Sequence, residues 1–443
     1  MDRRTFLSGG AALTGAALVT RSTEAEAQTH AGAQHPAAPA APGGQRAVVT
    51  PNGSTLPLRT VRGVRVGHLV AEAFEHEFLP GLRAECWGYN GATPGPTIEA
   101  VEGERVRIYV TNRLPEPTTV HWHGMVLPNG MDGISGLTQR PIPPGETYVY
   151  EFALRAPGTF MYHPHHDEMV QIALGMAGMF IVHPRVPRGP HVDRDFALMT
   201  HEWRVDAGAR RPNPMEMIEF NVLTFNSKAF PATAPMVVGR GERVRIRLGN
   251  LSPMDHHPIH LHGLQFKVTA TDGGYVPESA QRPETTVLVP VGSTRVIEFV
   301  PEEPGDWAMH CHMTHHVMNQ MGHGLPNMVG ADTGALDRRM RRVVPEYMSM
   351  GATGVGAMGE MGMPTPPNSA PMRGGAGPFS HIDMGGMFTL LKVRDRPDEA
   401  DAGAWYRHPE GTVAGPASAD QLRADGIDTD VRSGERRSSD PHA

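Results

Sequence analysis

The sequence GERVRI occurs twice, at residues 103–108 and again at residues 241–246. Each copy is followed by two His-X-His motifs, with the same order and similar spacing in both halves of the chain. Such a distant internal repeat indicates two homologous units in tandem, each of a common domain size. The four motifs lie at residues 121–123 and 163–165 in the first unit, and at residues 260–262 and 310–312 in the second.

Within each unit, hydrophobic and β-branched residues alternate with polar ones over short runs, such as residues 105–110, 147–152 and 294–300. Gly and Pro residues separate these runs at short intervals. A period of two with frequent turns is typical of antiparallel strands. We therefore predict an all-β fold in which two sandwich or barrel domains occupy residues 56–187 and 188–333.

The N-terminus has the features of a targeting segment. Arg3 and Arg4 precede a small-residue apolar run at residues 7–20. This pattern predicts a twin-arginine signal over residues 1–27, and a linker over 28–55 follows it. We therefore expect a periplasmic or secreted protein. The apolar run is itself too short and too weakly apolar to predict a membrane span, and we expect no membrane span after signal cleavage.

Residues 334–443 form a tail that is rich in Met, Gly and Pro, and we expect most of it to be disordered. Its one strand-like patch lies near residues 387–393. Eight methionines lie between Met348 and Met387. Thioethers select Cu(I), but the same composition is typical of a linker, so both interpretations stay open.

The 443 residues include 24 His, 26 Met and only two Cys, with a formal net charge of −7. Without a basic block, nucleic acid and anionic membranes are unfavourable partners. Two cysteines exclude a disulfide framework. Cys86 has no histidines near it and is expected to be a buried, inert thiol. Cys311 lies between His310 and His312, which points to metal chemistry.

A His-X-His pair on a strand places both imidazoles on the same face. One pair alone could be an ordinary polar face or a zinc ligand pair, but four pairs at matched positions of a repeat predict a metal centre. A thiolate, imidazoles and a long axial thioether are the ligands of blue copper. His257 precedes the third His-X-His motif, and His316 and Met321 follow Cys311 by five and ten residues, so these three residues can complete such a set.

These motifs resemble those of the multicopper oxidase family, which includes the laccases, over residues 62–329. The resemblance implies two tandem cupredoxin-like Greek-key domains and four copper ions per chain. It implies type 1 ligands at His257, Cys311, His316 and Met321, type 2 ligands at His121 and His260, and type 3 ligands at His123, His163 and His312 for one copper and His165, His262 and His310 for the other.

The repeat places the type 1 copper in the second unit. Carried back by the repeat offsets, the four type 1 positions fall on Thr118, Pro164, Met169 and Leu174, of which only Met169 could bind copper. Copper nitrite reductases carry this copper in the first domain and are therefore disfavoured. The chain instead resembles two-domain multicopper oxidases, which implies a homotrimer with trinuclear clusters between subunits.

The resemblance implies a laccase-like oxidase. Phenols or aromatic amines would lose single electrons at the type 1 copper, and O2 would be reduced to water at the trinuclear cluster. Two alternatives stay open. One is a metallo-oxidase of Cu(I) or another low-valent metal in copper tolerance, and the other is a copper-binding or electron-carrier protein without oxygen chemistry.

Proton supply is only partly assigned. Asp132 matches the family's acidic residue near the type 2 copper, where it would relay protons. Its alternative interpretation is an ordinary Asp-Gly turn. Some family members carry a second acidic residue, a Glu, in the fourth motif. The two candidate positions for it in this chain hold Thr314 and Val317. The second proton donor is therefore unassigned.

Overall fold

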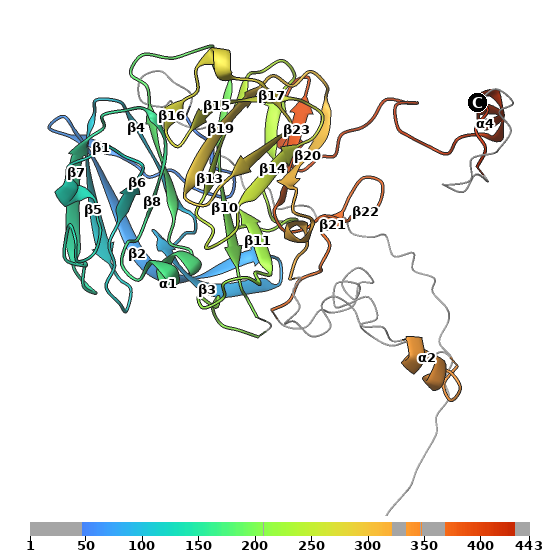
Figure 1. The fold of residues 1–443 in the computed structure, drawn as a ribbon, viewed down its shortest axis with the longest axis horizontal. Helices are drawn as coiled ribbons and strands as arrows, with labels where there is room; N and C mark the ends of the chain where they lie inside the picture. The colour runs from blue at the N-terminus through green and yellow to red at the C-terminus, as the bar shows by residue number, and fades with distance from the viewer. Residues whose placement is uncertain (1–46, 207, 321–333, 346, 348–367, 430–443) are drawn as a thin grey trace, which may run out of the picture.

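The computed structural model describes residues 47–206, 208–320, 334–345, 347 and 368–429 of the chain. The body consists of two neighbouring β domains, and its helices are short (Figure 1). The all-β prediction is confirmed. The signal segment, most of the predicted linker, Met321 and much of the Met-rich tail lie outside the described residues.

The first domain is built from two sheets. One has the order β1-β2-β5-β7, with β3 paired to β2, and the other has the order β4-β9-β8-β6. Large apolar side chains such as Trp122, Phe152 and Phe180 form the core of this domain. The strands are β1 Arg59–Val61, β2 Val64–Leu79, β3 Leu82–Tyr89, β4 Gly95–Val101, β5 Arg105–Asn112, β6 His121–His123, β7 Thr147–Ala153, β8 Gly158–His163 and β9 Gly178–His183.

The second domain repeats this plan. One sheet has the order β11-β10-β13-β19-β15-β16, with β17 paired to β15, and the other has the order β12-β23-β20-β14-β18. The strands are β10 Arg194–Trp203, β11 Val222–Phe225, β12 Met236–Gly239, β13 Val244–Asn250, β14 His257–Leu261, β15 Phe266–Thr271, β16 Gly274–Tyr275, β17 Pro283–Glu284, β18 Thr286–Val289, β19 Ser293–Phe299, β20 Gly305–Cys311 and β23 Phe388–Arg394.

The remaining described elements are short. The helices are η2 Asn129–Met131, α1 Glu168–Ala173, η3 Glu278–Ala280, η4 Thr314–Val317, α2 Gly334–Met340, η5 Glu399–Ala402 and α4 Ala419–Ala424, and the small hairpin pairs β21 Gly375–Ala376 with β22 His381–Ile382. Among the described residues, no helix has both the length and the apolar character needed to cross a membrane.

Strand pairing shows which elements of the two domains correspond. β9 runs parallel to β4 and antiparallel to β8, and β23 runs parallel to β12 and antiparallel to β20. β23 is therefore the second domain's counterpart of β9. β9 begins 15 positions after β8 ends (163 to 178), whereas β23 begins 77 positions after β20 ends (311 to 388). The predicted strand near residues 387–393 is confirmed, and it completes the sheet of the second domain.

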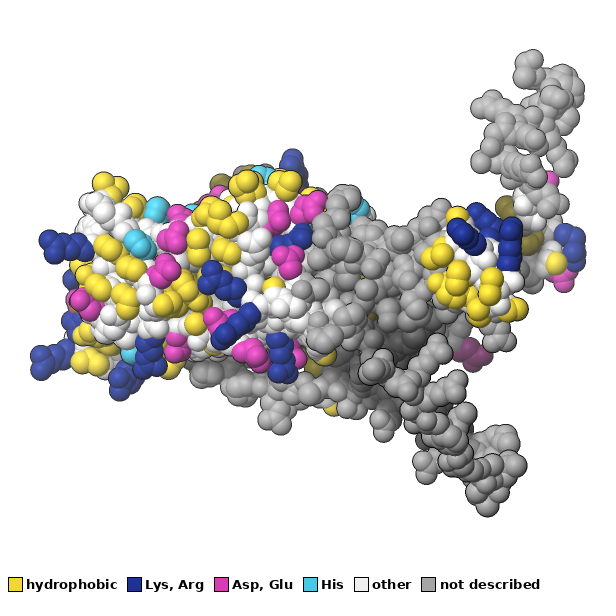
Figure 2. Space-filling view, turned by 90° about the horizontal axis from the view of Figure 1, so that it is seen from below, with side chains coloured by type: hydrophobic (Ala, Val, Ile, Leu, Met, Phe, Trp, Pro, Cys, Tyr) yellow, Lys and Arg dark blue, Asp and Glu magenta, His cyan; other side chains and the backbone are white. Residues whose placement is uncertain are grey.

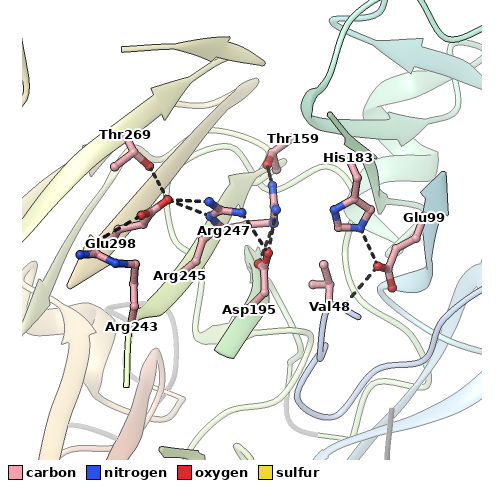
Figure 3. A network of polar contacts seen from close by, with 10 residues as sticks. All are labelled: Val48, Glu99, Thr159, His183, Asp195, Arg243, Arg245, Arg247, Thr269 and Glu298. Atoms are coloured by element: carbon pink, nitrogen blue, oxygen red, sulfur yellow. Dashed lines mark hydrogen bonds and ion pairs between the residues drawn. The ribbon is translucent and has the colours of Figure 1, made fainter. Parts of the chain in front are cut away.

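A buried polar network lies where the two domains meet (Figure 3). Arg247 of β13 donates two hydrogen bonds to Asp195 of β10, each 2.8 Å long. The same guanidinium donates to Thr159 Oγ1 in the first domain at 2.7 Å. Apolar residues from both domains, including Met161 and Met199, pack in a core cluster nearby. The two domains are thus joined by both polar and apolar contacts.

The end of the predicted linker is part of this junction. The Val49 amide donates to Asp195 O at 2.8 Å, and the Ala197 amide donates to Val49 O at 2.9 Å. The Val48 amide donates to Glu99 Oε2 at 3.2 Å (Figure 3). This segment therefore bonds to strands of both domains.

Charged side chains of both signs are interspersed with apolar ones over the described part of the face in Figure 2. No block of one sign covers the β domains on that face. This distribution agrees with the mild negative net charge and offers no extended basic surface there.

Candidate copper centres

Four imidazoles gather in the first domain. His121 and His123 lie on β6, and β6 pairs with β8 so that His121 faces His163 across the strands. Nδ1 of His123 lies 3.2 Å from Nε2 of His163. The ring of His165 lies 5.6 Å from the ring of His121, centre to centre. The structure therefore brings together all four predicted ligands of this domain.

The second domain holds an equivalent group. His260 lies on β14 and His262 directly follows this strand, and β14 pairs with β20 so that His260 faces His310. Nε2 of His262 lies 3.1 Å from Nε2 of His310. The ring centre of His312 is 5.6 Å from that of His260. Two four-histidine clusters thus occupy matching places in the two domains.

Each cluster is open to solvent on one side in the single chain. The His165 side chain is 36% exposed, and His312 is also exposed. Among the described residues, ring contacts join histidines within each cluster and none joins the two clusters. The eight imidazoles do not close around a common centre within one chain.

Backbone carbonyls set the orientation of several rings. Nδ1–H of His121 donates to Asp132 O at 2.8 Å, and Nδ1–H of His260 donates to Thr285 O at 2.7 Å. A donor hydrogen bond at Nδ1 leaves the Nε2 lone pair available for a metal.

Burial favours the neutral form of four cluster imidazoles, His123, His163, His262 and His310. Desolvation lowers the pKa of His163 to about 3. Desolvation is also the largest cause that lowers the pKa values of His123, His262 and His310. Because the neutral imidazole is the form that binds metal, these side chains are suited to ligation at neutral pH.

A third group surrounds Cys311 and is fully enclosed. The Cys311 Sγ lies 3.8 Å from His257 Nδ1 and 3.5 Å from His316 Nδ1. The exposed fractions of Cys311 and His257 are 0%, and that of His316 is 8%. β14 begins at His257, β20 ends at Cys311, and η4 turns the chain back so that His316 reaches the thiol. One sulfur and two imidazole nitrogens form the trigonal set that suits blue copper.

Burial shifts the pKa values of His257 and Cys311 so that both side chains are neutral in the metal-free chain. Desolvation, followed by the nearby His316, lowers the pKa of His257 to about 3. Desolvation raises the pKa of the Cys311 thiol to about 12. A metal must therefore displace the thiol proton when it binds. Nε2–H of His257 donates to Ser252 Oγ at 2.7 Å, which turns Nδ1 toward the sulfur.

Asp132 lies beside the first cluster. It follows η2 directly, and its Oδ1 is 3.4 Å from His121 Nδ1. The structure also places Glu168, which the sequence analysis did not select, at the same cluster. Its carboxylate oxygens lie 3.5 Å from His163 Nδ1 and 3.6 Å from His165 Nε2. Its position three residues after the second His-X-His motif was the available signal.

Two further carboxyl groups lie next to the Cys311 site. Asp255 Oδ2 is 3.5 Å from His316 Nε2, and this contact is the largest cause that lowers the pKa of Asp255. Glu202 Oε1 accepts hydrogen bonds from the amides of Met254 and Asp255 at 2.7 and 2.9 Å. Burial, with Asp255 next, raises the pKa of Glu202 to about 8. Glu202 lies on β10, too far away in sequence for motif spacing to reveal it.

The second cysteine has the environment expected from the sequence. Cys86 is buried, and burial raises the pKa of its thiol. It packs among apolar residues such as Phe78 and Trp203.

Two parts of the chain match the multicopper oxidase family, residues 71–187 and residues 206–330. Together with the two histidine clusters and the Cys311 site, these matches show that the chain belongs to the multicopper oxidase family. The family implies copper as the cofactor. The donor set agrees, because imidazoles and a thiolate are ligands that copper prefers.

Individual relatives have different names. Copper resistance protein A of Escherichia coli is 29% identical over 246 residues, which cover 45% of this chain and 40% of that protein. Dihydrogeodin oxidase of Aspergillus terreus is 32% identical, covering 49% of this chain and 38% of that one. This chain therefore spans only about two fifths of the length of these curated relatives.

Solved structures match over a larger share of their length. A blue copper oxidase from Nitrosomonas europaea superposes with a TM-score of 0.55 at 25% identity, covering 74% of this chain and 85% of that one. The multicopper oxidase mgLAC gives a TM-score of 0.55 at 26% identity, covering 75% and 86%. These matches confirm the cupredoxin-like fold.

Proposed function

We propose that this chain is a laccase-like oxidase that takes single electrons from small reducing substrates and reduces O2 to water. The observation that carries this proposal is the position of Cys311. Its buried sulfur faces His257 and His316, while its neighbours His310 and His312 belong to the second-domain cluster. Because side chains alternate along a strand, one short segment serves two metal centres.

Bound copper would supply one-electron redox chemistry and O2 binding. The ligand assignment is the one implied by the family resemblance, and the grouping of these side chains described above supports it. His257, Cys311 and His316 would hold the type 1 copper together with a thioether ligand. We assign His121 and His260 to type 2 copper, His123, His163 and His312 to one type 3 copper, and His165, His262 and His310 to the other, which gives four coppers per chain.

The open clusters support a site shared between subunits. Each presents four histidines, and a trinuclear site needs all eight. We propose a homotrimer in which the first-domain cluster of one chain faces the second-domain cluster of its neighbour. The homotrimer and the shared site are implied by the resemblance to two-domain members of the family.

The remaining roles fall to residues around these ligands. Asp132 would hold and deliver a proton near His121, since its Oδ1 is the nearest carboxylate atom to that ring in the described structure. His316 would be the entry point for electrons, because His257 is fully buried and covered by Ser252. We also propose that residues 1–27 direct export, so that the protein functions in the periplasm or outside the cell.

A second candidate function is oxidation of Cu(I). The observation that favours it is Met254, whose side chain is 53% exposed one residue before Asp255 at the His316 edge. A thioether beside a carboxylate is a suitable docking place for a soft cation. A relative named copper resistance protein A agrees with this possibility. A copper carrier without oxygen chemistry is less favoured, because it would need only the Cys311 site and neither of the two histidine clusters.

Copper content, absorption spectrum and O2 consumption test this proposal together. We expect four coppers per chain, a strong blue band, and O2 consumption with a phenolic donor or with Cu(I), without release of peroxide. The ratio of the two rates decides between the substrate classes. A blue protein that consumes no O2 with either donor would leave only the electron carrier.

A further inference from the structure

The segment Gly385–Phe388 encloses the type 1 site from the side of the sheet. The Cys311 amide donates to Met387 O at 3.1 Å, and the Met387 amide donates to His316 O at 2.9 Å. The backbone of Met387 is thus bonded to two of the three proposed ligands. The Gly385 amide also donates to Val317 O at 2.7 Å, so the segment follows η4 closely.

The strand register decides where the Met387 side chain lies. In the antiparallel pair of β20 and β23, His310 faces Phe388. One step further along the same ladder, Cys311 faces Met387, as the hydrogen bond between them shows. Residues that face each other in an antiparallel pair place their side chains on the same side of the sheet. Cys311 and Met387 both have 0% exposure and belong to the same core cluster.

The backbone before Met387 is built for this close approach. Gly386 has a φ of +58°, and a Cβ atom at that position would lie 2.3 Å from His316 O. Only glycine therefore fits there. The Gly386 amide donates to Oδ1 of the buried Asn319 at 2.8 Å, and Asn319 Nδ2 donates to Phe230 O at 3.1 Å. These contacts fix the position of Met387 against the site.

The chain after η4 does not continue directly into this strand. The Asn319 amide donates to Met372 O at 2.7 Å, and the Gln320 amide donates to Asn221 O at 2.6 Å. The Gln320 side chain accepts from the Ala370 amide at 2.7 Å. The strand next to Cys311 is supplied only after the long insertion, by β23. Met321 was predicted from its position ten residues after Cys311. That spacing assumes a short loop between η4 and the next strand, and the long insertion is not taken into account.

We propose that Met387, and not Met321, supplies the axial thioether of the type 1 copper. The proposal rests on the proposed site at His257, Cys311 and His316. Met387 is the buried thioether on the strand neighbour of Cys311, and a long axial thioether is what this trigonal set lacks. Met321 lies outside the described residues and is the competing assignment.

The test compares Met387→Leu with the matched variant Met321→Leu in the full copper-loaded chain. Loss of an axial thioether should raise the reduction potential of the blue copper and change its absorption and spin-resonance spectra, since the axial ligand tunes this site. We expect these changes in Met387→Leu and unchanged spectra in Met321→Leu. A Met387→Gln variant, which offers an amide oxygen, should lower the potential.

The outcomes separate this proposal from the function proposed above. A shift in Met321→Leu alone, or in neither variant, overturns the role of Met387 and leaves the blue site intact. A wild-type chain without a blue band overturns the site itself. If both Met387 variants fail to fold, Co2+-loaded protein with 13C-methyl methionine decides the question. The strongly shifted methyl signal should persist in Met321→Leu, and its loss there would assign the ligand to Met321.

Discussion

Asp132 contacts His121 through both its side chain and its backbone. Its Oδ1 lies 3.4 Å from His121 Nδ1, and its carbonyl oxygen accepts a hydrogen bond from the same nitrogen at 2.8 Å. The backbone contact can hold the ring even when the carboxylate is removed. Ring orientation and proton delivery are therefore separable by substitution.

Asp132→Asn should lower kcat for O2 reduction about 100-fold, because general acid catalysis typically contributes at least that much. Copper content should stay at the wild-type level, since the carbonyl of residue 132 still holds His121. Steady-state O2 consumption and metal analysis measure the two effects. Asp383→Asn, an exposed carboxylate whose side chain is 74% accessible, is the control and should be fully active. Wild-type kcat in Asp132→Asn would remove Asp132 from the mechanism.

Cys311→Ser should abolish the blue band and the turnover together, because the hydroxyl is a poor substitute for the thiolate. The eight cluster histidines are unchanged, so we expect about one copper fewer per chain. Absorption spectra and metal analysis measure these losses. Cys86→Ser is the control, since this thiol is buried among apolar residues and belongs to none of the three histidine groups. A blue Cys311→Ser protein would be incompatible with the proposed site.

Two variant chains with complementary defects test whether each trinuclear site is formed by clusters from two subunits. A His123→Ala chain lacks a first-domain ligand, and a His262→Ala chain lacks a second-domain ligand. Each alone should be inactive. When the two are unfolded and refolded together, mixed oligomers should regain part of the activity, because some interfaces then combine two intact clusters. Mass measurement should find trimers, and absence of recovery in mixed trimers would contradict a trinuclear site that is shared between subunits.

The two histidine clusters illustrate what the sequence could predict. Their motifs are local, and strand alternation alone places His121 and His123 on one face. Glu202 and Glu168 were not predicted, because their places at the sites depend on tertiary packing. Glu202 is next to the Cys311 site through the amides of Met254 and Asp255, and Glu168 is next to the first cluster because α1 begins there. The position of Met387 was hidden for a related reason. β23 follows a long insertion, and only the strand pairing shows that it is the second domain's counterpart of β9.

The network between the domains predicts that loss of a buried ion pair lowers the free energy of unfolding more than loss of an exposed ion pair does. Arg247 and Asp195 have side chains that are 7% and 4% exposed, whereas Arg105, paired with Glu151, is 55% exposed. Arg247→Met leaves a buried carboxylate short of a partner and should destabilise the fold by about 3 to 5 kcal/mol. Arg105→Met should change the free energy of unfolding by less than about 1 kcal/mol. Denaturant unfolding measures both, and equal effects would contradict this assignment.

A buried histidine of the first domain, His76, is bonded to the second domain and predicts how stability depends on pH. His76 Nε2–H donates to Ser227 O at 2.6 Å. Burial, with the charge of Lys228 next, lowers the pKa of His76 from 6.5 to about 4. The unfolded chain therefore takes up a proton below pH 6.5, while the folded chain does so only near pH 4. The stabilisation is complete above pH 6.5 and is lost as the pH falls toward 4, by about 3 kcal/mol.

His76→Gln removes this titration and keeps a donor that can reach the Ser227 carbonyl. The variant should be less stable than the wild type at pH 7.5, and the difference should shrink as the pH falls to 4.5. Urea unfolding of the copper-free chains at several pH values measures this difference, with copper omitted because its ligands also titrate. His191→Gln, at a side chain that is 78% exposed, is the matched control. The free energy of unfolding of His191→Gln should equal that of the wild type at every pH. If the free energies of His76→Gln and the wild type differ by the same amount at every pH, His76 does not contribute to the pH dependence.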